Sequence, residues 1–500
     1  MPFLPSSRYP QPSYQFARKH GVLVGEHSTD TDDGDLTVMF RPPLKPNIVA
    51  ELRRFLEAPF HLKQVKSEDF DRFLGDHYQE DGEGDLRSMA DMGEELDLDD
   101  FSESLAESQD LLDSDDDAPI IRFINTILKR AIKEGASDIH FEPYENQLVV
   151  RTRVDGILQE VTTQPSKVIP IVISRLKVMA ELDIAEKRIP QDGRITRKVG
   201  GKTVDMRVST LPSGSSERVV LRLLDRQAGK LTLPQLGMSD VTLDGLQQCI
   251  EKPHGIFLVT GPTGSGKTTT LYASLDKLND TKRNILTVED PIEYYIDGIG
   301  QTQVNNKVDM SFARGLRAIL RQDPDVVMVG EIRDLETADI SVQASLTGHM
   351  VFSTLHTNTA ISSITRLRDM GVEPFLLSST VTGVLAQRLV RRLCSSCKVP
   401  HTMSASEAKK IGMPDEEGTE IFKSTGCIEC NGLGYAGRTG IHELVIINDE
   451  LQTLIHDGAS ELELERVARQ STCSILEDGA KKIIAGVTTI EEVLRVCREA

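Results

Sequence analysis

The segment from Gly261 to Thr268 has the composition and spacing of a phosphate-binding loop. Its residues, Gly-Pro-Thr-Gly-Ser-Gly-Lys-Thr, match the pattern GxxxxGK[ST]. Glycines let backbone amides turn toward phosphate oxygens, while Lys267 neutralises the β and γ oxygens and Thr268 ligates magnesium. We therefore predict a site for ATP and Mg²⁺. The predicted binding residues are Gly261, Pro262, Thr263, Gly264, Ser265, Gly266, Lys267, Thr268 and Thr269.

The segments on either side of this loop have the order that the motif requires. The apolar run Ile256 to Val259 precedes the loop, and the helix-prone run Thr268 to Leu278 follows it. A strand, a glycine-rich loop and a helix in this order place the helix N-terminus, with its positive partial charge, at the phosphates. A chance glycine-rich turn would lack these flanking segments.

Carboxylates follow the next predicted strand, Ile285 to Val288. The sequence continues as Glu289-Asp290-Pro291-Ile292-Glu293, which places acidic side chains at the carboxyl edge of the sheet, where open α/β sheets bind ligands. Glu289 either positions magnesium or water, or it caps a neighbouring helix, as carboxylates at strand ends often do. These residues alone leave both interpretations open.

A third predicted strand, Val326 to Val329, ends in Gly330-Glu331 and resembles a Walker B strand. The Asp that usually accompanies magnesium is replaced by Gly330. Glu331 is therefore the best candidate to orient or deprotonate the attacking water.

Two histidines bracket the next predicted strand, Met350 to Ser353: His349 precedes it and His356 follows it. A histidine near a strand end is more often a structural hydrogen-bonding residue than a catalytic one. Because His356 follows three phosphate-related motifs, we predict that it senses the γ-phosphate.

Arg314, Arg317 and Arg321 recur at helical spacing and predict one cationic face of a helix. Either this face is solvated, or its arginines stabilise the charge of the transferred phosphate, within a subunit or across an interface.

Four of the seven cysteines form two CxxC pairs, separated by 29 residues. This spacing predicts a closed, structural Zn²⁺ site that staples an inserted hairpin, because four thiolates leave no open position for water. The predicted zinc ligands are Cys394, Cys397, Cys427 and Cys430. The other cysteines, Cys249, Cys473 and Cys497, are predicted to be small buried apolar residues.

The length of 500 residues exceeds what one hydrophobic core usually serves, so several domains are expected. The net charge is −20, and residues 90–117 hold 13 Asp or Glu but no Lys or Arg. Repulsion among these acidic side chains predicts a flexible linker at 86–117, with a solvated spacer as its simplest role.

A small N-terminal domain is predicted at 1–85, including a helix from Pro46 to Leu56.

Two further domains are predicted after the linker. Residues 120–134 have the pattern of an amphipathic helix, and strand-like pieces follow, so 118–230 is predicted to be an α+β domain. From about Leu236 short strands alternate with helical patterns, which is typical of a parallel sheet covered by helices. We therefore predict the α/β fold class, with a RecA-like P-loop ATPase domain at 236–500 that includes the zinc-binding insert 394–430.

Charge and hydropathy argue against several classes of protein. A net charge of −20 and the absence of Trp disfavour nucleic acid as the main ligand, because phosphate backbones attract surplus Lys and Arg and bases stack on aromatic rings. The first 21 residues lack a continuous apolar core, so no secretory signal is expected. No run of about 18 apolar residues occurs, so any membrane location is expected to come through a partner.

These motifs, in this order, resemble those of the secretion ATPase superfamily, which serves type II secretion, type IV pili and related machines. The resemblance covers about residues 118–500. The four-cysteine insert resembles the assembly and export branch, since pilus retraction motors generally lack it, and the segment Tyr14 to Leu23 resembles type II secretion motors. The motifs that carry the resemblance are the phosphate loop, the box Glu289 to Glu293, Gly330-Glu331, the segment His349 to His356 and the segment Gly434 to Gly440.

The resemblance implies that the α+β domain at 118–230 is PAS-like. It also implies a hexameric ring in which this domain rotates against the nucleotide domain, with ATP between them. It places Arg207 and Arg222 near the phosphates, although sequence alone makes them ordinary charged positions on strands. It also implies that the N-terminal domain docks on an inner-membrane platform protein, so that the protein is cytoplasmic and peripheral on the inner membrane. The expected catalytic residues are then Glu331, Lys267, Glu289, His356, Arg207 and Arg222.

The implied function is that of a motor that couples ATP hydrolysis to pseudopilus assembly and protein export by type II secretion. A type IV pilus assembly motor shares every catalytic motif and the cysteine insert, so only the N-terminal domain separates these two functions. A scaffold that binds ATP and hardly hydrolyses it remains open because Gly330 replaces the usual Asp. A nucleic-acid translocase is a third alternative, which the overall acidity disfavours.

Overall fold

The computed structural model divides the chain into two units, Met1–Leu112 and Asp113–Ala500, which are described separately. The predicted acidic linker at 86–117 lies outside the residues that the structure describes. The described residues are 3–4, 12, 17, 20–27, 36–42, 44, 46–56, 58–66, 70, 118–199, 202–214, 216–224 and 231–497.

The first unit contains a four-stranded sheet with one long helix, α2 (Pro46–Leu56), whose bounds match the predicted helix. Its buried side chains, among them Ile48 and Leu52, pack against Val22 and Val38 of the sheet. The helix connects β3 to β4, which pair in parallel and therefore need a crossover. The strands are β1 (Phe3–Leu4), β2 (Val22–His27), β3 (Leu36–Phe40) and β4 (His61–Gln64).

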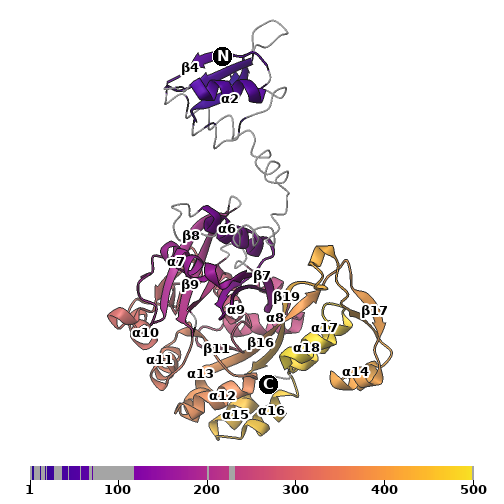
Figure 1. Ribbon diagram of the computed structural model, residues 1–500. Coiled ribbons are helices and arrows are strands. Elements are labelled where there is room, and N and C mark those ends of the chain that lie inside the picture. Colours follow the sequence, from indigo (N-terminus) through magenta and orange to yellow (C-terminus); the bar gives the residue numbers. More distant parts are fainter. Residues whose placement is uncertain are drawn as a thin grey trace. The chain divides into compact units, whose positions relative to one another are not determined.

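The second unit begins with helix α6 (Ala118–Lys133) and a six-stranded antiparallel sheet in the order β7-β6-β5-β10-β9-β8. Strand β6 alternates between buried and more exposed side chains along part of its length, as expected of a sheet with one covered face. Helix α7 (Ile169–Met179) lies beside α6 in Figure 1 and contacts it. The strands are β5 (Asp138–Pro143), β6 (Gln147–Val154), β7 (Ile157–Pro165), β8 (Gln191–Val199), β9 (Lys202–Pro212) and β10 (Glu217–Leu224).

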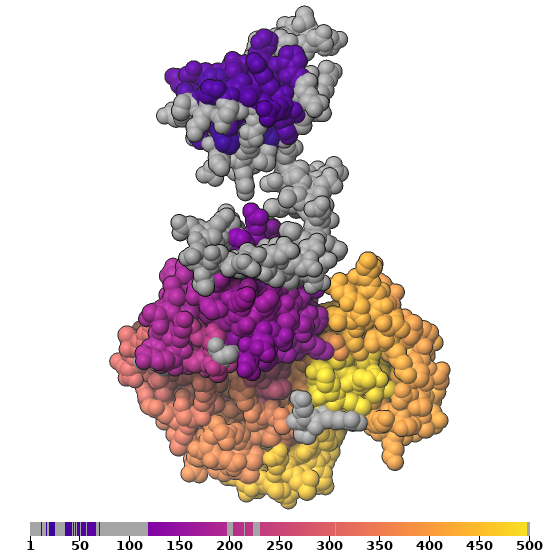
Figure 2. Space-filling view, in the orientation of Figure 1, coloured from indigo at the N-terminus to yellow at the C-terminus, as the bar shows by residue number. Residues whose placement is uncertain are grey.

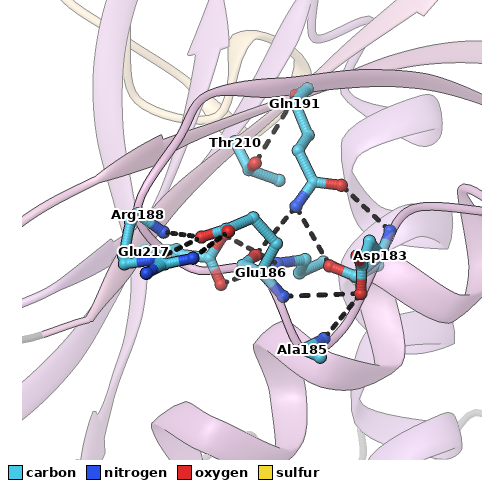
Figure 3. A network of polar contacts seen from close by, with 8 residues as sticks. Asp183, Ala185, Glu186, Arg188, Gln191, Thr210 and Glu217 are labelled. Atoms are coloured by element: carbon cyan, nitrogen blue, oxygen red, sulfur yellow. Dashed lines mark hydrogen bonds and ion pairs between the residues drawn. The ribbon is translucent and has the colours of Figure 1, made fainter.

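A buried ion pair fixes the turn between α7 and β8. The side chains of Lys177 and Glu217 are 1% and 2% exposed, and Lys177 Nζ lies 2.8 Å from Glu217 Oε1. Lys177 also donates to the carbonyl oxygen of Glu186. Figure 3 shows how Gln191 closes the same turn, since its Nε2 donates to the carbonyls of Asp183 and Glu186 at 3.0 and 2.9 Å. Removing one partner would leave an uncompensated buried charge, which is strongly destabilising.

The rest of the second unit is built on a seven-stranded sheet in the order β13-β12-β14-β15-β11-β16-β19. All neighbouring pairs are parallel except β16 and β19. The strand before the phosphate loop, β11, therefore lies in the interior of the sheet beside β15, as expected for a RecA-like domain. The strands are β11 (Gly255–Thr260), β12 (Ile285–Glu289), β13 (Gly300–Gln303), β14 (Val326–Val329), β15 (Met350–Leu355), β16 (Val381–Leu393) and β19 (Tyr435–Ile446).

Helices cover this sheet and bury its central strands on both faces. Every residue of β11, β14 and β15 is buried, which explains why these strands are mostly apolar in the sequence. The predicted α/β fold class is confirmed. The helices are α8 (Asp240–Ile250), α9 (Lys267–Leu278), α10 (Phe312–Ile319), α11 (Leu335–Leu346), α12 (Ala360–Asp369), α13 (Pro374–Thr380), α15 (Asp449–His456), α16 (Glu461–Ala468), α17 (Ile475–Ile484) and α18 (Ile490–Cys497).

The insert between β16 and β19 contains a two-stranded hairpin and helix α14 (Ala405–Lys410). Its strands are β17 (Val399–Thr402) and β18 (Glu420–Lys423), and α17 packs against β18. Figure 2 shows the insert, in orange, as a lobe beside the yellow C-terminal helices. Short 3₁₀ segments complete the unit: Ser166–Val168, Leu233–Leu236, Asn306–Val308, Pro414–Glu416 and Ile428–Cys430.

Two predictions about single residues were wrong. Cys473 is exposed, because it lies between α16 and α17, where its sulfur accepts a hydrogen bond from Lys481 at 3.0 Å. Arg321 lies beyond the end of α10, which stops at Ile319, so the three arginines do not share one helix. Within the described residues, no helix has the length and apolarity needed to span a bilayer.

Candidate functional site

A cavity of about 1190 Å³ lies where the carboxyl ends of several parallel strands meet. The segment Thr263 to Thr269 lines one side, and the box Glu289 to Tyr295 contributes to another. The same cavity contains Glu331, His356 and Arg222. The parallel sheet therefore brings together motifs that lie far apart in the chain, at the edge where such sheets bind ligands.

The phosphate loop depends on glycines at positive φ. Gly261, Gly264 and Gly266 have φ of 144°, 79° and 88°, which side chains rarely adopt. A Cβ atom on Gly261 would also lie 2.4 Å from the carbonyl oxygen of Gln387. The loop therefore requires glycine for both its conformation and its close packing on β16.

Gln387, which the sequence analysis missed, anchors the loop from strand β16. Its side chain is 2% exposed, its Nε2 donates to the carbonyl oxygen of Ser265 at 2.8 Å, and its Oε1 accepts from Thr270 at 2.6 Å. These contacts fix both the loop and the first turn of α9. No local motif marks this glutamine, because the contact joins residues that are distant in the sequence.

Lys267 is folded back onto its own loop. Its Nζ donates to the carbonyl oxygens of Gly261 and Pro262 at 2.7 and 3.2 Å. Burial disfavours the charged amine and lowers the pKa of Lys267 to about 8, against a smaller opposing effect of Glu331. The ammonium group is thus held at the cavity by two uncharged carbonyl oxygens. Charged phosphate oxygens would form stronger hydrogen bonds with it and could replace them.

The lowered pKa of Lys267 predicts that ATP affinity decreases above about pH 8. The phosphates bind the protonated amine of Lys267. Above the pKa that Lys267 has without nucleotide, the amine must take up a proton when ATP binds, so ATP affinity should fall up to about tenfold per pH unit. Nucleotide titration at about pH 7 and about pH 9, one unit on either side of that pKa, measures the effect. A Lys267→Arg chain, whose guanidinium stays charged, should lose this dependence; equal affinities of the unaltered chain at both pH values would contradict it.

Glu331 lies at the end of β14 with two basic neighbours. It forms an ion pair with Arg333, and its Oε2 lies 3.6 Å from His356 Nε2. The Glu331 side chain is 14% exposed, so it faces the cavity from a largely shielded position. Burial and the nearby Lys267 charge lower the pKa of His356, which favours a neutral imidazole beside this carboxylate.

Gly330 packs against Phe312 of α10 and against the end of β12. A Cβ atom there would lie 3.3 Å from the ring of Phe312 and 3.5 Å from the Cα of Glu289. Its carbonyl oxygen accepts a hydrogen bond from Thr354 at 2.7 Å. A Cβ atom at Gly330 would thus be tight only against the Phe312 ring, so packing alone does not explain why glycine replaces the Asp of a usual Walker B strand.

Glu289 is buried and both of its oxygens are hydrogen bonded. Tyr272 donates to Oε2, while Thr287 and Gln301 donate to Oε1 at 2.6 and 3.0 Å. Burial raises the pKa of Glu289, and these hydrogen bonds oppose the increase. Glu289 was expected either to position magnesium or water or to cap a helix. The structure does not support helix capping, because the hydrogen-bond partners of the Glu289 carboxylate are side chains of α9, β12 and β13. Tyr272, Thr287 and Gln301 were not identified from sequence.

Two arginines of the six-stranded sheet lie at or near the cavity. Arg222 lines the cavity and donates to Asp138 at 2.9 Å. Arg207 contacts the acidic box instead, where its Nη2 lies 3.1 Å from the carbonyl oxygen of Ile292 and 3.3 Å from Glu293 Oε2. In this conformation both guanidinium groups are thus paired with protein oxygens close to the cavity.

A second contact joins the six-stranded sheet to the seven-stranded sheet and could not be predicted from the sequence. Asp155, at the β6–β7 turn, accepts from the backbone N–H of Gly437 at 3.0 Å and pairs with Arg438 at 3.2 Å. Asp155 has φ of 48°, which Asp tolerates better than most residues. The segment Gly434 to Gly440, recognised only as a family motif, therefore touches the preceding sheet at the cavity.

The three arginines at and after α10, and the other histidine, have local partners. Arg314 pairs with Asp309, Arg317 with Glu336, and Arg321 donates to the carbonyl oxygen of Arg317. His349 lies 2.8 Å from the carbonyl oxygen of Ala344. Among the described residues, the cavity lining includes none of these four, so within one chain they lie outside the candidate site.

The four predicted zinc ligands lie together at the base of the insert. Their sulfur atoms all lie within 4.8 Å of one another, and three of the pairs are 3.7 to 3.8 Å apart. A tetrahedral site with Zn–S bonds of about 2.3 Å requires sulfur separations of about 3.8 Å. Backbone N–H groups of Cys427 and Gly434 donate to Cys430 Sγ. The donor set and its spacing therefore fit Zn²⁺.

Comparison with known proteins extends the similarity beyond the site. The chain matches the family described as "Type II/IV secretion system protein" over residues 113–495, and a domain family of "GSPII protein E" over residues 11–78. It is 55% identical to the type II secretion system protein E of Aeromonas hydrophila, covering 98% of this chain and 97% of that protein. It is also 55% identical to the type II secretion system ATPase E of Vibrio cholerae, covering 97% and 96%.

Solved structures share the fold of the second unit. The pilus retraction motor PilT with bound ADP is 27% identical, with a TM-score of 0.51, and the match covers 75% of this chain and 96% of PilT. The Legionella pneumophila ATPase DotB, 21% identical, has a TM-score of 0.54 over 76% of this chain and 96% of DotB.

Proposed function

This chain belongs to the type II/IV secretion system protein family, and we propose that it is the ATPase that powers protein export through a type II secretion system. Its relatives over nearly the whole chain are type II secretion system E proteins. The observation that carries the proposal is the cavity in which residues 263–269 of the phosphate loop lie together with Glu331. Hydrolysis of ATP in this cavity would drive the growth of a pseudopilus and the export of proteins across the outer membrane.

The residues of the cavity suit the steps of phosphoryl transfer to water. The loop amides and Lys267 bind the phosphates, and Glu331 orients water or accepts its proton. Thr268, which is exposed in the cavity, would hold Mg²⁺ through its hydroxyl. Bound Mg²⁺ would neutralise charge on the β and γ oxygens. His356, 3.6 Å from Glu331, would respond to the γ-phosphate.

Arg207 and Arg222 would stabilise the charge that develops on the transferred phosphate. In the structure Arg207 pairs with Glu293, which lines the cavity, and Arg222 pairs with Asp138. A small rotation of the six-stranded sheet against the seven-stranded sheet would let both arginines exchange these carboxylates for phosphate oxygens. Each cycle would then close the two domains around ATP and reopen them on product release. A hexameric ring of such chains would convert this motion into pseudopilus assembly.

The N-terminal domain is proposed to dock on an inner-membrane platform protein. The match of residues 11–78 to a domain family of GSPII protein E supports this assignment. The protein would then work in the cytoplasm, peripheral on the inner membrane, and would reach the membrane through its partner.

The same match favours type II secretion over pilus assembly. The two motors share every catalytic motif and the cysteine insert, so only the N-terminal domain distinguishes them, and residues 11–78 match a domain family of GSPII protein E. Relatives of the full length are also type II secretion proteins. The resemblance to PilT concerns the second unit, which both classes of motor share.

Zinc in the insert leads to a separate prediction. Replacing both Cys427 and Cys430 with Ser should reduce bound zinc from about one ion per chain to none and expose the insert to hydrogen exchange, because metal binding and local folding are coupled. Metal analysis and exchange of amides in residues 394–434 measure both effects. The matched control is Cys473→Ser, which removes an exposed thiol outside the cluster. Full zinc occupancy in the double variant would contradict the assignment.

Turnover by the purified full-length chain tests the ATPase proposal. Because its arginines must meet the phosphates across moving domains, the unassembled chain should hydrolyse ATP well below about 10 per second, an ordinary enzyme rate, and assembly should increase the rate. Lys267→Ala should abolish it in both states. Equal hydrolysis by the unaltered and Lys267→Ala chains would show that the activity does not come from this site.

A further inference from the structure

The hydroxyl group of Tyr272 connects the phosphate-loop helix to the acidic box. We infer that Tyr272 is a positioning residue of the ATPase reaction, which holds Glu289 and the backbone of the box in register with α9. This inference rests on the proposed function and adds a residue to it. Hydrogen bonds, burial and the connections of the elements involved support it.

Tyr272 makes contacts on both sides of the box. Its hydroxyl donates to Glu289 Oε2 and accepts from the backbone N–H of Glu293 at 3.2 Å. Gln301 Nε2 lies 3.4 Å from the same oxygen. Three segments, α9, the end of β12 and the loop at Glu293, therefore meet at one phenolic oxygen.

Burial makes these contacts obligatory. Tyr272 is 1% exposed and Glu289 is 3% exposed, so water does not replace either partner. An unpaired polar group at such a position is costly. Burial and the neighbouring carboxylates raise the pKa of the Tyr272 phenol, which therefore remains a hydrogen-bond donor under all ordinary conditions.

The ring and the hydroxyl of Tyr272 have separable roles. The ring packs in the apolar core beneath α9 and meets Tyr294 edge to face, with centroids 4.6 Å apart and an interplanar angle of 76°. Ring packing alone would hold α9 against the sheet. Of these two parts of Tyr272, the hydroxyl group is the one that donates to the Glu289 carboxylate, so removing it tests positioning without removing the packing.

The connection reaches both the phosphate loop and the domain contact. Helix α9 begins at Lys267, and Tyr272 lies in its second turn. On the other side, Glu293 and the carbonyl of Ile292 hold Arg207 of the preceding sheet. A displacement of α9 when phosphates bind would thus be transmitted through Tyr272 to the segment that Arg207 contacts.

A buried tyrosine that only fills the core would behave differently from a positioning residue. Loss of packing alone would lower stability without altering the pH dependence of turnover. Burial raises the pKa of Glu289 and the Tyr272 hydrogen bond opposes this, so losing the hydroxyl should raise that pKa further. The acid limb of the pH–rate profile should then move to higher pH, because the carboxylate form is lost sooner as the pH falls.

The experiment compares full-length Tyr272→Phe with the unaltered chain under conditions of assembly. We expect kcat to fall about tenfold, with KM for ATP within about twofold, since one hydrogen bond to a charged group is lost while the phosphate loop is intact. The acid limb should shift upward. The matched control is Tyr144→Phe, which removes a hydroxyl that donates to another buried carboxylate, Glu142, at 3.3 Å, outside the cavity.

A second variant protects the test against a folding defect. Thr287→Val removes the donor to the other oxygen of Glu289 with an isosteric side chain and should shift the acid limb in the same direction. The inference would be overturned if a folded Tyr272→Phe protein had the turnover and the pH profile of the unaltered chain. If Tyr272→Phe does not fold, an unshifted acid limb in Thr287→Val would overturn it. If the unaltered and Lys267→Ala chains hydrolyse ATP equally, the proposed function itself fails.

Discussion

Replacing Glu331 with Gln is expected to reduce the ATP turnover number about 10²- to 10⁴-fold, the usual contribution of a general base. The amide keeps the size of the side chain but accepts a proton poorly. ATP should still bind, because Lys267 and the loop amides are unaltered. Steady-state turnover and nucleotide titration measure the two effects separately.

Glu336→Gln is the matched control for this substitution. Glu336 pairs with Arg317 at the surface with 57% of its side chain exposed, so its loss should leave turnover within about twofold, as for other exposed ion pairs. If Glu331→Gln hydrolysed ATP as fast as the unaltered chain, Glu331 would not be the base. If the unaltered, assembled chain scarcely hydrolysed ATP, the scaffold alternative would hold.

Replacing Arg207 with Ala is expected to reduce kcat about 10³-fold, as loss of an arginine that stabilises transferred phosphate does in related chemistry. The same change also removes the contact of the six-stranded sheet with Glu293 and the carbonyl of Ile292. ATP affinity should change only a few fold, because the phosphate loop belongs to the other sheet. Pre-steady-state turnover with saturating ATP isolates the effect on chemistry.

Arg197→Ala provides the comparison within the same sheet. Arg197 lies exposed on β8 and is not among the described residues that line the cavity, so its removal should leave turnover unaltered. A decrease in ATP affinity without a decrease in kcat for Arg207→Ala would assign Arg207 to ground-state binding. Equal turnover of the Arg207→Ala and Arg197→Ala chains would exclude a role in catalysis.

The elements that carry the phosphate loop could be predicted because their signals are local. The run Ile256 to Val259 is uniformly apolar, and it forms most of a strand buried on both faces. The helix predicted from Thr268 to Leu278 begins one residue earlier, at Lys267. The CxxC spacing likewise predicted a cluster that the fold assembles from both ends of the insert.

Contacts between distant segments could not be predicted in this way. Nothing near Tyr272 or Gln387 in the sequence marks them as partners of the acidic box and the loop. Their roles arise from the order of the strands, which places β12 and β16 on either side of the elements that carry the motifs. Arg207 and Arg222 were identified only through family resemblance, since their strands contain many charged residues.

The two incorrect predictions have a common physical origin. Cys473 was assigned to the core from the general behaviour of free cysteines, and Arg321 was assigned to a helix from its spacing alone. In the fold, a turn exposes Cys473 and α10 ends before the segment that leads to Asp325. Residue type and spacing alone determine neither the residue at which a helix ends nor which residue lies in an exposed turn.

The measurement that most directly tests the central claim is made in the bacterium that encodes this chain. The gene is deleted, complemented with the unaltered or the Lys267→Ala form, and extracellular enzyme secretion and surface pili are assayed side by side. We predict that deletion abolishes secretion but leaves pili, and that only the unaltered form restores export. Loss of pili with continued secretion would contradict this account and identify the chain as a pilus assembly motor.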